Sequence, residues 1–302
     1  MKGRLDAEGR ELLRRARIGM LALRAGKWPL VNPAAFYYGS DAVWITTSRH
    51  AVKAGLARDN APASFLVDDG RHCVLLEGEA ELFDALSLPN QVRAALEGPS
   101  FYLNLAGYAF KNAAFIGGYL RDIARIPREW WPQNRAVLRL RAERAWSLPA
   151  IPQPPAGSAT LPGLPAGVRR SLAREPVAYL CTLVDGVPLM APALWAEDDD
   201  GLRIVTGVAG FLGIERQGGL GGLAVEYHHR YRATRMSGAY LRGRLLMTGD
   251  AKAAVKERYD LDVAPRGLGL KLQPRRVTWW RGFEVRTAAI EAETSEESSG
   301  LG

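Results

Sequence analysis

The chain has 302 residues, of which 47% are hydrophobic and 24% are charged, a composition typical of a globular protein with room for two domains. No apolar run approaches the roughly 18 residues that a membrane helix needs, and the first residues lack the apolar segment of a signal peptide. We therefore expect a cytoplasmic protein without a membrane partner. The two cysteines exclude a disulfide framework, and with the four histidines they show no metal-binding spacing, so we expect no metal site.

The net charge is +8, and 33 of the 40 basic residues are arginine. Arginine suits flat anions such as phosphates and carboxylates, so an anionic ligand or a nucleic acid is a candidate partner. A GC-rich coding sequence is an alternative explanation, because alanine and glycine are abundant as well. The charge alone does not choose between these explanations.

The first predicted element is a short amphipathic helix in which Leu12, Leu13 and Ala16 share one face. Short strands follow, each pair separated by a turn that carries glycine or aspartate. They cover residues 18–25, 28–38, 42–48, 63–69 and 73–83. An aromatic and helical stretch then occupies roughly residues 85–130, which interrupts the strand pattern.

The second half of the chain repeats the first. A shift of 159 residues aligns Pro29–Thr47 with Pro188–Thr206, and seven of these nineteen positions are identical. Chance would give roughly one identity in twenty, so the sequence indicates an internal duplication. The second copy has its own predicted strands and a shorter helical stretch; the strands cover residues 177–184, 188–196, 202–207, 221–229 and 239–247.

Short, regularly spaced strands with few helices favour antiparallel barrels. We therefore predict a mainly β protein with short helices, built as two tandem antiparallel split β-barrels that form an intramolecular pseudo-dimer. The first barrel would cover residues 1–147 and the second residues 168–290. Between them, residues 148–167 hold six prolines and three glycines and read as an extended linker. Residues 291–302 read as a flexible acidic tail.

The order of these features resembles the split β-barrel flavoproteins typified by pyridoxamine 5′-phosphate oxidase. The resemblance rests on a helix, a proline-bearing strand pair, the TTS sequence, a following lysine and the LVDD sequence, and it covers residues 8–83 and 168–288. In that family two barrels pair, and FMN lies in the groove between them. The resemblance therefore implies an FMN site within this single chain.

The resemblance places the FMN phosphate at the end of the third strand. Thr46, Thr47 and Ser48 supply hydroxyl groups there, and Lys53 matches the second position of a basic pair that the family has in this segment. Val52 replaces the first basic residue. A phosphate dianion needs hydroxyl or backbone donors and a fixed cation. The alternative is a surface turn beside a solvated lysine.

The flavin ring is expected along the second strand, beside Asn32, Pro33 and Ala34. In the C-terminal segment PRRVTWWRGFEVR, Trp280 matches the tryptophan that approaches the flavin from the other barrel, and Gly282 matches the glycine that follows. Because adjacent residues of a strand face opposite sides, only one of the two tryptophans in this segment is expected to face the cofactor. Core packing is the alternative role for either ring.

Arg286 matches an arginine with which the oxidase holds its substrate, so it is a candidate substrate-binding residue. Ala288 replaces the family's histidine, so a vitamin B6 oxidase is not expected. We predict instead an FMN-dependent oxidoreductase that acts on an unidentified small organic substrate with a separate reductant. The flavin would supply the redox chemistry, and the sequence assigns no catalytic side chain.

The second copy lacks the phosphate-binding pattern, because Leu212 stands where the first copy has Lys53 and Gly207 where it has Ser48. We read residues 207–222, which contain many glycines, as a flexible loop. The closing tryptophan–glycine pattern is present only in the second copy. One flavin per chain is therefore predicted, with a degenerate second groove.

Three alternatives remain open. A deazaflavin coenzyme would use the same groove, and a non-catalytic flavin- or haem-binding protein is a second possibility. Haem would need an axial ligand, for which His50, His72, His228 and His229 are candidates. The third alternative is nucleic-acid binding, because residues 229–235 interleave aromatic and basic side chains, but we expect a solvated strand face there and no nucleic-acid partner.

The aromatic residues 101–115 would either cover the site or mediate oligomerisation, so the protein is expected to be a monomer or a homodimer.

Overall fold

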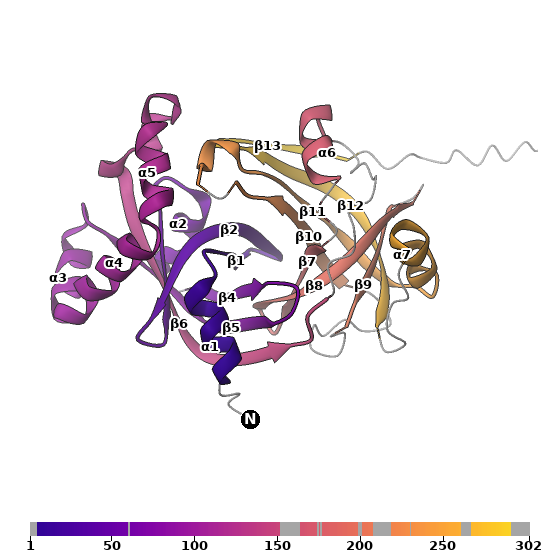
Figure 1. Ribbon diagram of the computed structural model, residues 1–302, viewed down its shortest axis with the longest axis horizontal. Coiled ribbons are helices and arrows are strands. Elements are labelled where there is room, and N and C mark those ends of the chain that lie inside the picture. The colour runs from indigo at the N-terminus through magenta and orange to yellow at the C-terminus, as the bar shows by residue number, and fades with distance from the viewer. Residues whose placement is uncertain are drawn as a thin grey trace, which may run out of the picture.

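The computed structural model describes residues 5–59, 61–151, 164–173, 175, 177–198, 201–207, 219–229, 231–260 and 267–290. Within these residues the protein is mostly strands, arranged as two barrels that follow one another along the chain (Figure 1). The predicted tail at 291–302 and the greater part of the predicted linker lie outside the described residues. The predicted fold of two tandem antiparallel barrels is confirmed.

The first barrel closes in the order β1-β2-β3-β6-β5-β4, with every neighbouring pair antiparallel. Its strands are β1 (Ile18–Ala25), β2 (Trp28–Gly39), β3 (Ala42–Ser48), β4 (Ala61–Asp68), β5 (Cys73–Asp84) and β6 (Arg135–Leu148). Leucine, valine and phenylalanine side chains that alternate along these strands fill its interior, among them Leu21, Phe36 and Phe65.

The second barrel has the same order, β7-β8-β9-β12-β11-β10, and it closes through the pairing of β10 with β7. One further strand, β13, pairs with β12 outside the closed ring. The strands are β7 (Val177–Val184), β8 (Val187–Asp198), β9 (Gly201–Thr206), β10 (Gly219–Tyr227), β11 (Ser237–Met247), β12 (Leu268–Arg281) and β13 (Glu284–Ala289).

Short helices cover the barrels, and three of them form the insertion between β5 and β6. The α-helices are α1 (Ala7–Arg15), α2 (Val52–Leu56), α3 (Leu88–Leu96), α4 (Pro99–Lys111), α5 (Ala113–Arg121), α6 (Ala166–Leu172) and α7 (Ala251–Tyr259). The 3₁₀ helices are η1 (Ala57–Asp59), η2 (Ile123–Arg125), η3 (Arg128–Trp130), η4 (Pro132–Asn134) and η6 (Ala233–Arg235). Figure 1 shows α3 and α4 on the side of the first barrel that faces away from the second.

The two barrels share strand register as well as strand order. Ile18 pairs with Ala35 in the first barrel, and Val177 pairs with Leu194 in the second, which is the same pair shifted by 159 residues. Both barrels also have a register shift at one glycine, Gly78 in β5 and Gly243 in β11. A side chain at either position would lie within 2 Å of a carbonyl oxygen on the neighbouring strand, so only glycine fits.

The barrels also share one hydrophobic core. Met20, Val31, Leu66 and Leu75 turn outward from the first barrel and pack with the core residues of the second. Strands β1, β2 and β4 supply this contact on one side, and β7, β8 and β10 supply it on the other. At its centre the hydroxyl of Tyr240 donates a hydrogen bond of 2.5 Å to the carbonyl oxygen of Pro29. Because apolar surface is buried between them, the barrels form a single packed unit.

Two local expectations need correction. The N-terminal helix begins at Ala7, because the Asp6 side chain accepts a hydrogen bond from the Gly9 amide and caps it, and Ala16 lies just past its end. The glycines at 219–222 are part of strand β10 rather than of a loop. Gly222 is small for a reason of packing, because the ring of Tyr240 occupies the space that a side chain there would need.

Candidate functional site

The candidate site is a gap between strands β2 and β3 of the first barrel. The two strands pair only from Phe36 opposite Ile45 to the turn, so the edge of β2 over residues 29–35 has no strand beside it in the described sheet. Helix α2 lies at this gap, and Nζ of Lys53 approaches the carbonyl oxygen of Pro33 to 3.5 Å. We call this gap, with the side chains that line it, the first split.

A second cation reaches the first split from strand β6. Because Ser48 pairs with Arg135, the guanidinium of Arg135 lies beside the end of β3. It donates hydrogen bonds to the hydroxyl of Thr46 at 2.9 Å and to its carbonyl oxygen at 3.2 Å. The same hydroxyl donates to Oη of Tyr108 in α4 at 2.9 Å. Thr46 therefore faces outward, toward the insertion, and holds the arginine at the strand end.

Neither cation has an acidic partner among the described residues. Removal from water and, to a lesser extent, the nearby charge of Arg135 together lower the pKa of Lys53 to about 8. Desolvation also lowers the pKa of Arg135. The neighbouring Arg49 differs, because it pairs with Asp84 at 2.8 Å. Two desolvated cations without a carboxylate make an environment that favours an anion.

The other hydroxyls of the TTS sequence have different surroundings. Thr47 points into the barrel, is 1% exposed, and its hydroxyl has no hydrogen-bond partner. Ser48 is fully buried and donates a bond of 2.5 Å to the carbonyl oxygen of Glu129, while its own oxygen accepts from the amide of His50. Ser48 therefore holds the insertion against β3, and Thr46 is the hydroxyl that faces the cations.

The second barrel reaches the first split through an aromatic contact. The ring of Tyr119 in α5 lies 5.5 Å from the guanidinium of Arg135 and 6.3 Å, edge-on, from the ring of Phe283. Phe283 belongs to the turn between β12 and β13 and also packs on Trp130, at 5.3 Å. The closing hairpin of the second barrel thus meets the cation pair of the first through one tyrosine.

An ion pair holds α5 against the second barrel. Asp122, 3% exposed, accepts two hydrogen bonds from the guanidinium of Arg232 and one of 2.6 Å from the hydroxyl of Thr234. These bonds lower the pKa of Asp122 to about 2. Gly118 lies so close to the carbonyl oxygen of Tyr231 that a side chain there would clash. One arginine of the basic stretch at 229–235 therefore serves an internal contact.

Trp280 and Arg286 do not join this group in the described contacts. Trp280 is 8% exposed, belongs to the shared core, and its ring fills the space above Gly238. Its indole Nε1 is buried without a hydrogen-bond partner. Arg286 is exposed on β13, where it donates to Glu284 at 2.8 Å and lies 5.9 Å from the ring of Trp279.

The equivalent gap of the second barrel, which we call the second split, has a different lining. The hydroxyl of Thr206, the counterpart of Thr47, donates to the carbonyl oxygen of Pro192 at 3.0 Å. Because Thr206 pairs with Leu268 as Thr47 pairs with Ala136, the counterpart of Arg135 is Gly267. Leu212, the counterpart of Lys53 in the sequence, lies outside the described residues.

Three of the four candidate haem ligands have side-chain partners in the described structure. His72 lies 3.3 Å from a carboxylate oxygen of Glu8, and Nδ1 of His228 lies 2.8 Å from Glu226, whose hydrogen bond raises the pKa of this histidine. Nδ1 of His229 accepts the amide of Tyr231, and His50 is exposed. Within the described ranges no three His, Cys, Asp or Glu side chains form a group suited to a metal ion.

Sequence reasoning missed four contributors to the first split: Arg135, Tyr108, Tyr119 and Phe283. The only sequence signal for Arg135 is its position as the first residue of the strand that follows the insertion. Phe283 is part of the closing hairpin that the sequence singled out, three residues beyond Trp280.

Among the described helices, none is long and apolar enough to span a bilayer.

The solved structures that resemble this chain include named flavin- and haem-binding proteins. A protein from Listeria innocua, provisionally named a pyridoxamine 5′-phosphate oxidase, is 14% identical over 47% of this chain and 95% of its own, with a TM-score of 0.30. A FAD-binding protein from Mesorhizobium loti is 18% identical over 47% of this chain and 93% of its own, with a TM-score of 0.32.

A haem-binding protein from Mycobacterium smegmatis is 16% identical over 42% of this chain and 59% of its own, with a TM-score of 0.33. No protein-family model and no curated protein matches the sequence. The fold is therefore defined by the strand order and register of the chain itself.

Proposed function

We propose that the first split binds the phosphate of FMN and that the protein is an FMN-dependent oxidoreductase acting on a small organic substrate. The observation that carries this proposal is the pair Lys53 and Arg135, two desolvated cations beside the Thr46 hydroxyl that have no acidic partner among the described residues. A phosphate dianion would supply the missing negative charge and accept hydrogen bonds from both cations, with Thr46 holding Arg135 in place.

The open edge of β2 fits the rest of this ligand. The edge over residues 29–35, which includes Asn32, Pro33 and Ala34, has no neighbouring strand in the described sheet, so a flat ring would meet no other strand there.

When bound, the flavin would supply the hydride or electron transfer. The residues of this chain would then bind and orient it: Lys53, Arg135 and Thr46 at the phosphate, and the edge of β2 along the ring. The closing hairpin of the second barrel would complete the site from the other side, since Phe283 already contacts Tyr119 beside Arg135. Arg286 remains a candidate for the substrate.

The proposal predicts one flavin per chain, because the second split has glycine where the first has Arg135 and leucine where it has Lys53. Titration of the purified protein with FMN, followed by absorbance and flavin fluorescence, tests this directly. We expect saturation near one equivalent, and weaker binding in the variant Arg135→Ala. Two equivalents, or binding that this substitution leaves unchanged, would contradict the proposal.

The same titration separates the alternatives. A deazaflavin coenzyme with an acidic tail suits the same two cations, so it is titrated beside FMN. Haem is titrated as a third ligand, because its propionates are also anions. A Soret band that saturates with haem, together with no response to either flavin, would replace the oxidoreductase proposal with a haem-binding one. Turnover of a nicotinamide reductant by the flavin-loaded protein would support catalysis.

A further inference from the structure

Helices α3 and α4 of the insertion lie on the side of the first barrel that faces away from the second (Figure 1), and they expose an apolar surface. Its side chains are between 54% and 88% exposed: Leu88, Val92, Leu96, Tyr102, Leu103 and Phe110. Together they present several hundred Å², since each of the two aromatic rings would by itself bury roughly 150–250 Å² if fully covered. The largest apolar patch of a typical monomer is about 300–600 Å².

The spacing of these residues puts them on continuous faces of the two helices. Leu88, Val92 and Leu96 follow one another at intervals of four along α3, and Leu103 and Phe110 are seven residues apart on α4. The opposite side of α4 is buried against β2 and β3. We call the exposed side of α3 and α4 the outer face.

The charged residues of α3 and α4 turn away from the outer face. Arg93 donates to the carbonyl oxygen of Leu82 and lies over the ring of Phe83. Lys111 donates to the carbonyl oxygen of Leu13 at 2.9 Å. Glu97, just past the end of α3, accepts hydrogen bonds from Arg139 and Arg141 of β6. The outer face is therefore uncharged, although the chain as a whole carries a net charge of +8.

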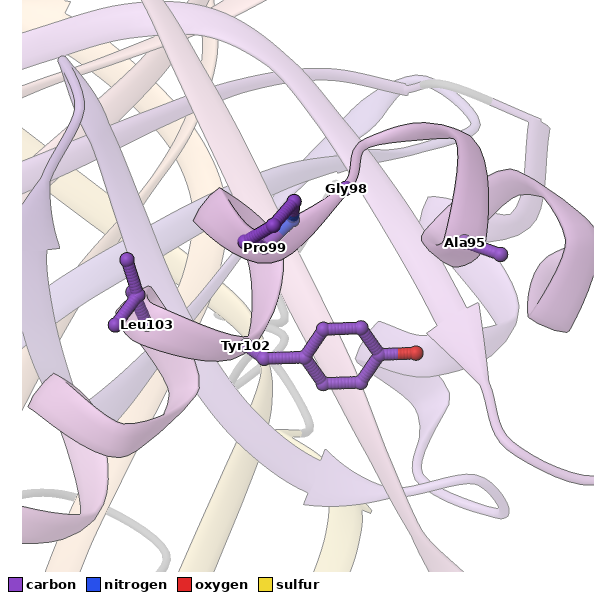
Figure 2. A pocket seen from close by; sticks show the side chains of 5 residues that line it. All are labelled: Ala95, Gly98, Pro99, Tyr102 and Leu103. Atoms are coloured by element: carbon purple, nitrogen blue, oxygen red, sulfur yellow. The ribbon is translucent and has the colours of Figure 1, made fainter.

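The outer face contains both a hollow and a projection. A pocket of about 600 Å³ lies where α3 meets α4, lined by Ala95, Gly98, Pro99, Tyr102 and Leu103. Figure 2 shows these residues around the turn, with the ring of Tyr102 extending from α4. Phe110, 88% exposed, projects from the same helix about two turns beyond Leu103.

We propose that the outer face is an interface between two copies of this chain, related by a two-fold axis that crosses α4 near Ala106. A two-fold interface needs a surface that is complementary to itself, and a hollow and a projection on one helix satisfy this requirement. With the two α4 helices antiparallel, Phe110 of each copy enters the pocket beside Leu103 of the other. The apolar area of several hundred Å² would make up the greater part of the roughly 800 Å² per partner that a standard stable interface buries.

The charges favour a second copy over an anionic lipid surface. Adsorption to anionic lipid relies on lysine and arginine side chains beside the apolar residues, and here Arg93 and Lys111 are directed back onto the first barrel. Two positively charged copies also repel each other least when they meet through an uncharged face.

The mass of the full chain in solution, measured by light scattering and sedimentation between about 1 and 100 μM, tests the proposal. We expect a dimer, and we expect Phe110→Glu to weaken it roughly tenfold or more, as removal of a central aromatic anchor does. Met247→Glu is the matched control, since it places the same charge on an exposed apolar residue of the second barrel. A wild-type monomer at 100 μM, or an unchanged dimer in Phe110→Glu, would overturn the proposal.

A cysteine near the axis tests the geometry. Ala106 is exposed between Leu103 and Phe110, and both native cysteines are buried. Under mild oxidation we expect Ala106→Cys to form a disulfide-linked dimer and Met247→Cys to remain a monomer on a non-reducing gel. Equal cross-linking of the two variants would contradict the two-fold arrangement. Binding of the wild-type chain, and not of Phe110→Glu, to anionic vesicles without a dimer would assign the face to lipid instead.

Discussion

The first and second splits occupy equivalent places in two barrels with the same strand order, yet their chemistry differs. In the first split, Lys53 approaches the carbonyl oxygen of Pro33, and Arg135 binds Thr46. In the second split, the hydroxyl of Thr206 satisfies the equivalent carbonyl oxygen, that of Pro192, and glycine replaces the arginine. Among the described residues, the same backbone thus leaves cations without an acidic partner in one gap and places an internal hydrogen bond in the other.

The closing strands show the opposite difference. The glycines at the register shift, Gly78 and Gly243, give a common reference point. Five residues before it, the first barrel has Cys73 opposite Leu148, whereas the second has Gly238 opposite Trp280. The glycine leaves room for the indole ring. Under the proposed function, the first barrel would supply the cations for the phosphate and the second barrel the closing hairpin. Two barrels with the same strand order can therefore differ in what they bind. The ligand is determined by a few side chains at the strand ends and not by the symmetry of the fold.

The largest expected effect is loss of the cation pair. The double variant Lys53→Ala, Arg135→Ala should weaken FMN binding by roughly 100-fold or more, because each charge-assisted hydrogen bond contributes about 1.5–3 kcal/mol. The matched control, Lys27→Ala with Arg244→Ala, removes one lysine and one arginine from exposed positions. Equal affinities in the two double variants, measured by fluorescence titration, would show that the first split is no phosphate site.

The lowered pKa of Lys53 predicts how FMN affinity depends on pH. A bound phosphate favours the protonated amine, so it raises the pKa of this lysine from its value of about 8 in the free protein. Affinity should therefore be constant from pH 7 to 8 and should fall by up to about tenfold per pH unit above pH 8. Lys53→Ala should bind more weakly throughout and lose this pH dependence. FMN titrations of both proteins at several pH values test this. If the affinity of the variant fell as steeply above pH 8 as that of the wild type, Lys53 would not be the group that titrates.

The variant Trp280→Leu places in the second barrel the residue that the first barrel has at the equivalent position, Leu148. If the indole ring contacts the flavin, FMN affinity should fall several-fold, since aromatic contacts contribute about 0.5–1.5 kcal/mol. Trp279→Leu is the control, because the neighbouring residue of a strand faces the opposite side. Equal affinities for wild type and Trp280→Leu would leave Trp280 a core residue only. Thermal unfolding of both variants without FMN measures the loss of packing separately.

The smallest effect concerns the two equivalent threonines. Thr206→Val removes the hydrogen bond to Pro192 and should lower the free energy of unfolding by about 1 kcal/mol. Thr47→Val removes a buried hydroxyl that has no partner, so it should leave this free energy unchanged or raise it by up to about 1 kcal/mol. Urea unfolding of the FMN-free variants measures both. A similar loss in both would show that Thr47 has a partner in solution.

Most strands were predictable because their signals are local. Residues 18–25, 42–48 and 177–184 were predicted with the bounds that the structure has. Their ends are marked by turns that require positive φ, at Gly26, Asp41 and Gly186. The repeat extends this to the second barrel. If β1 is assumed to pair with β2, then β7 must pair with β8, and both hairpins have the same register.

The lining of the first split was only partly predictable. Lys53 and Thr46 lie in one short segment whose pattern is visible in the sequence. Arg135 lies 87 positions after Ser48, and only the pairing of β6 with β3 places it there. Tyr119 and Phe283 meet across the barrels through tertiary packing, for which no sequence period exists. The segment proposed to bind the phosphate could thus be chosen from the sequence, whereas Arg135 could not.

The tandem arrangement has a genetic consequence. In a dimer of identical barrels, every substitution appears twice, so a lysine lost from one groove is lost from both. In this chain each barrel is encoded separately, and a single substitution changes one split without the other. The combination seen here, with cations in the first barrel and the tryptophan in the second, is available only to a fused chain. Duplication thus frees one of two formerly equivalent surfaces for a different use.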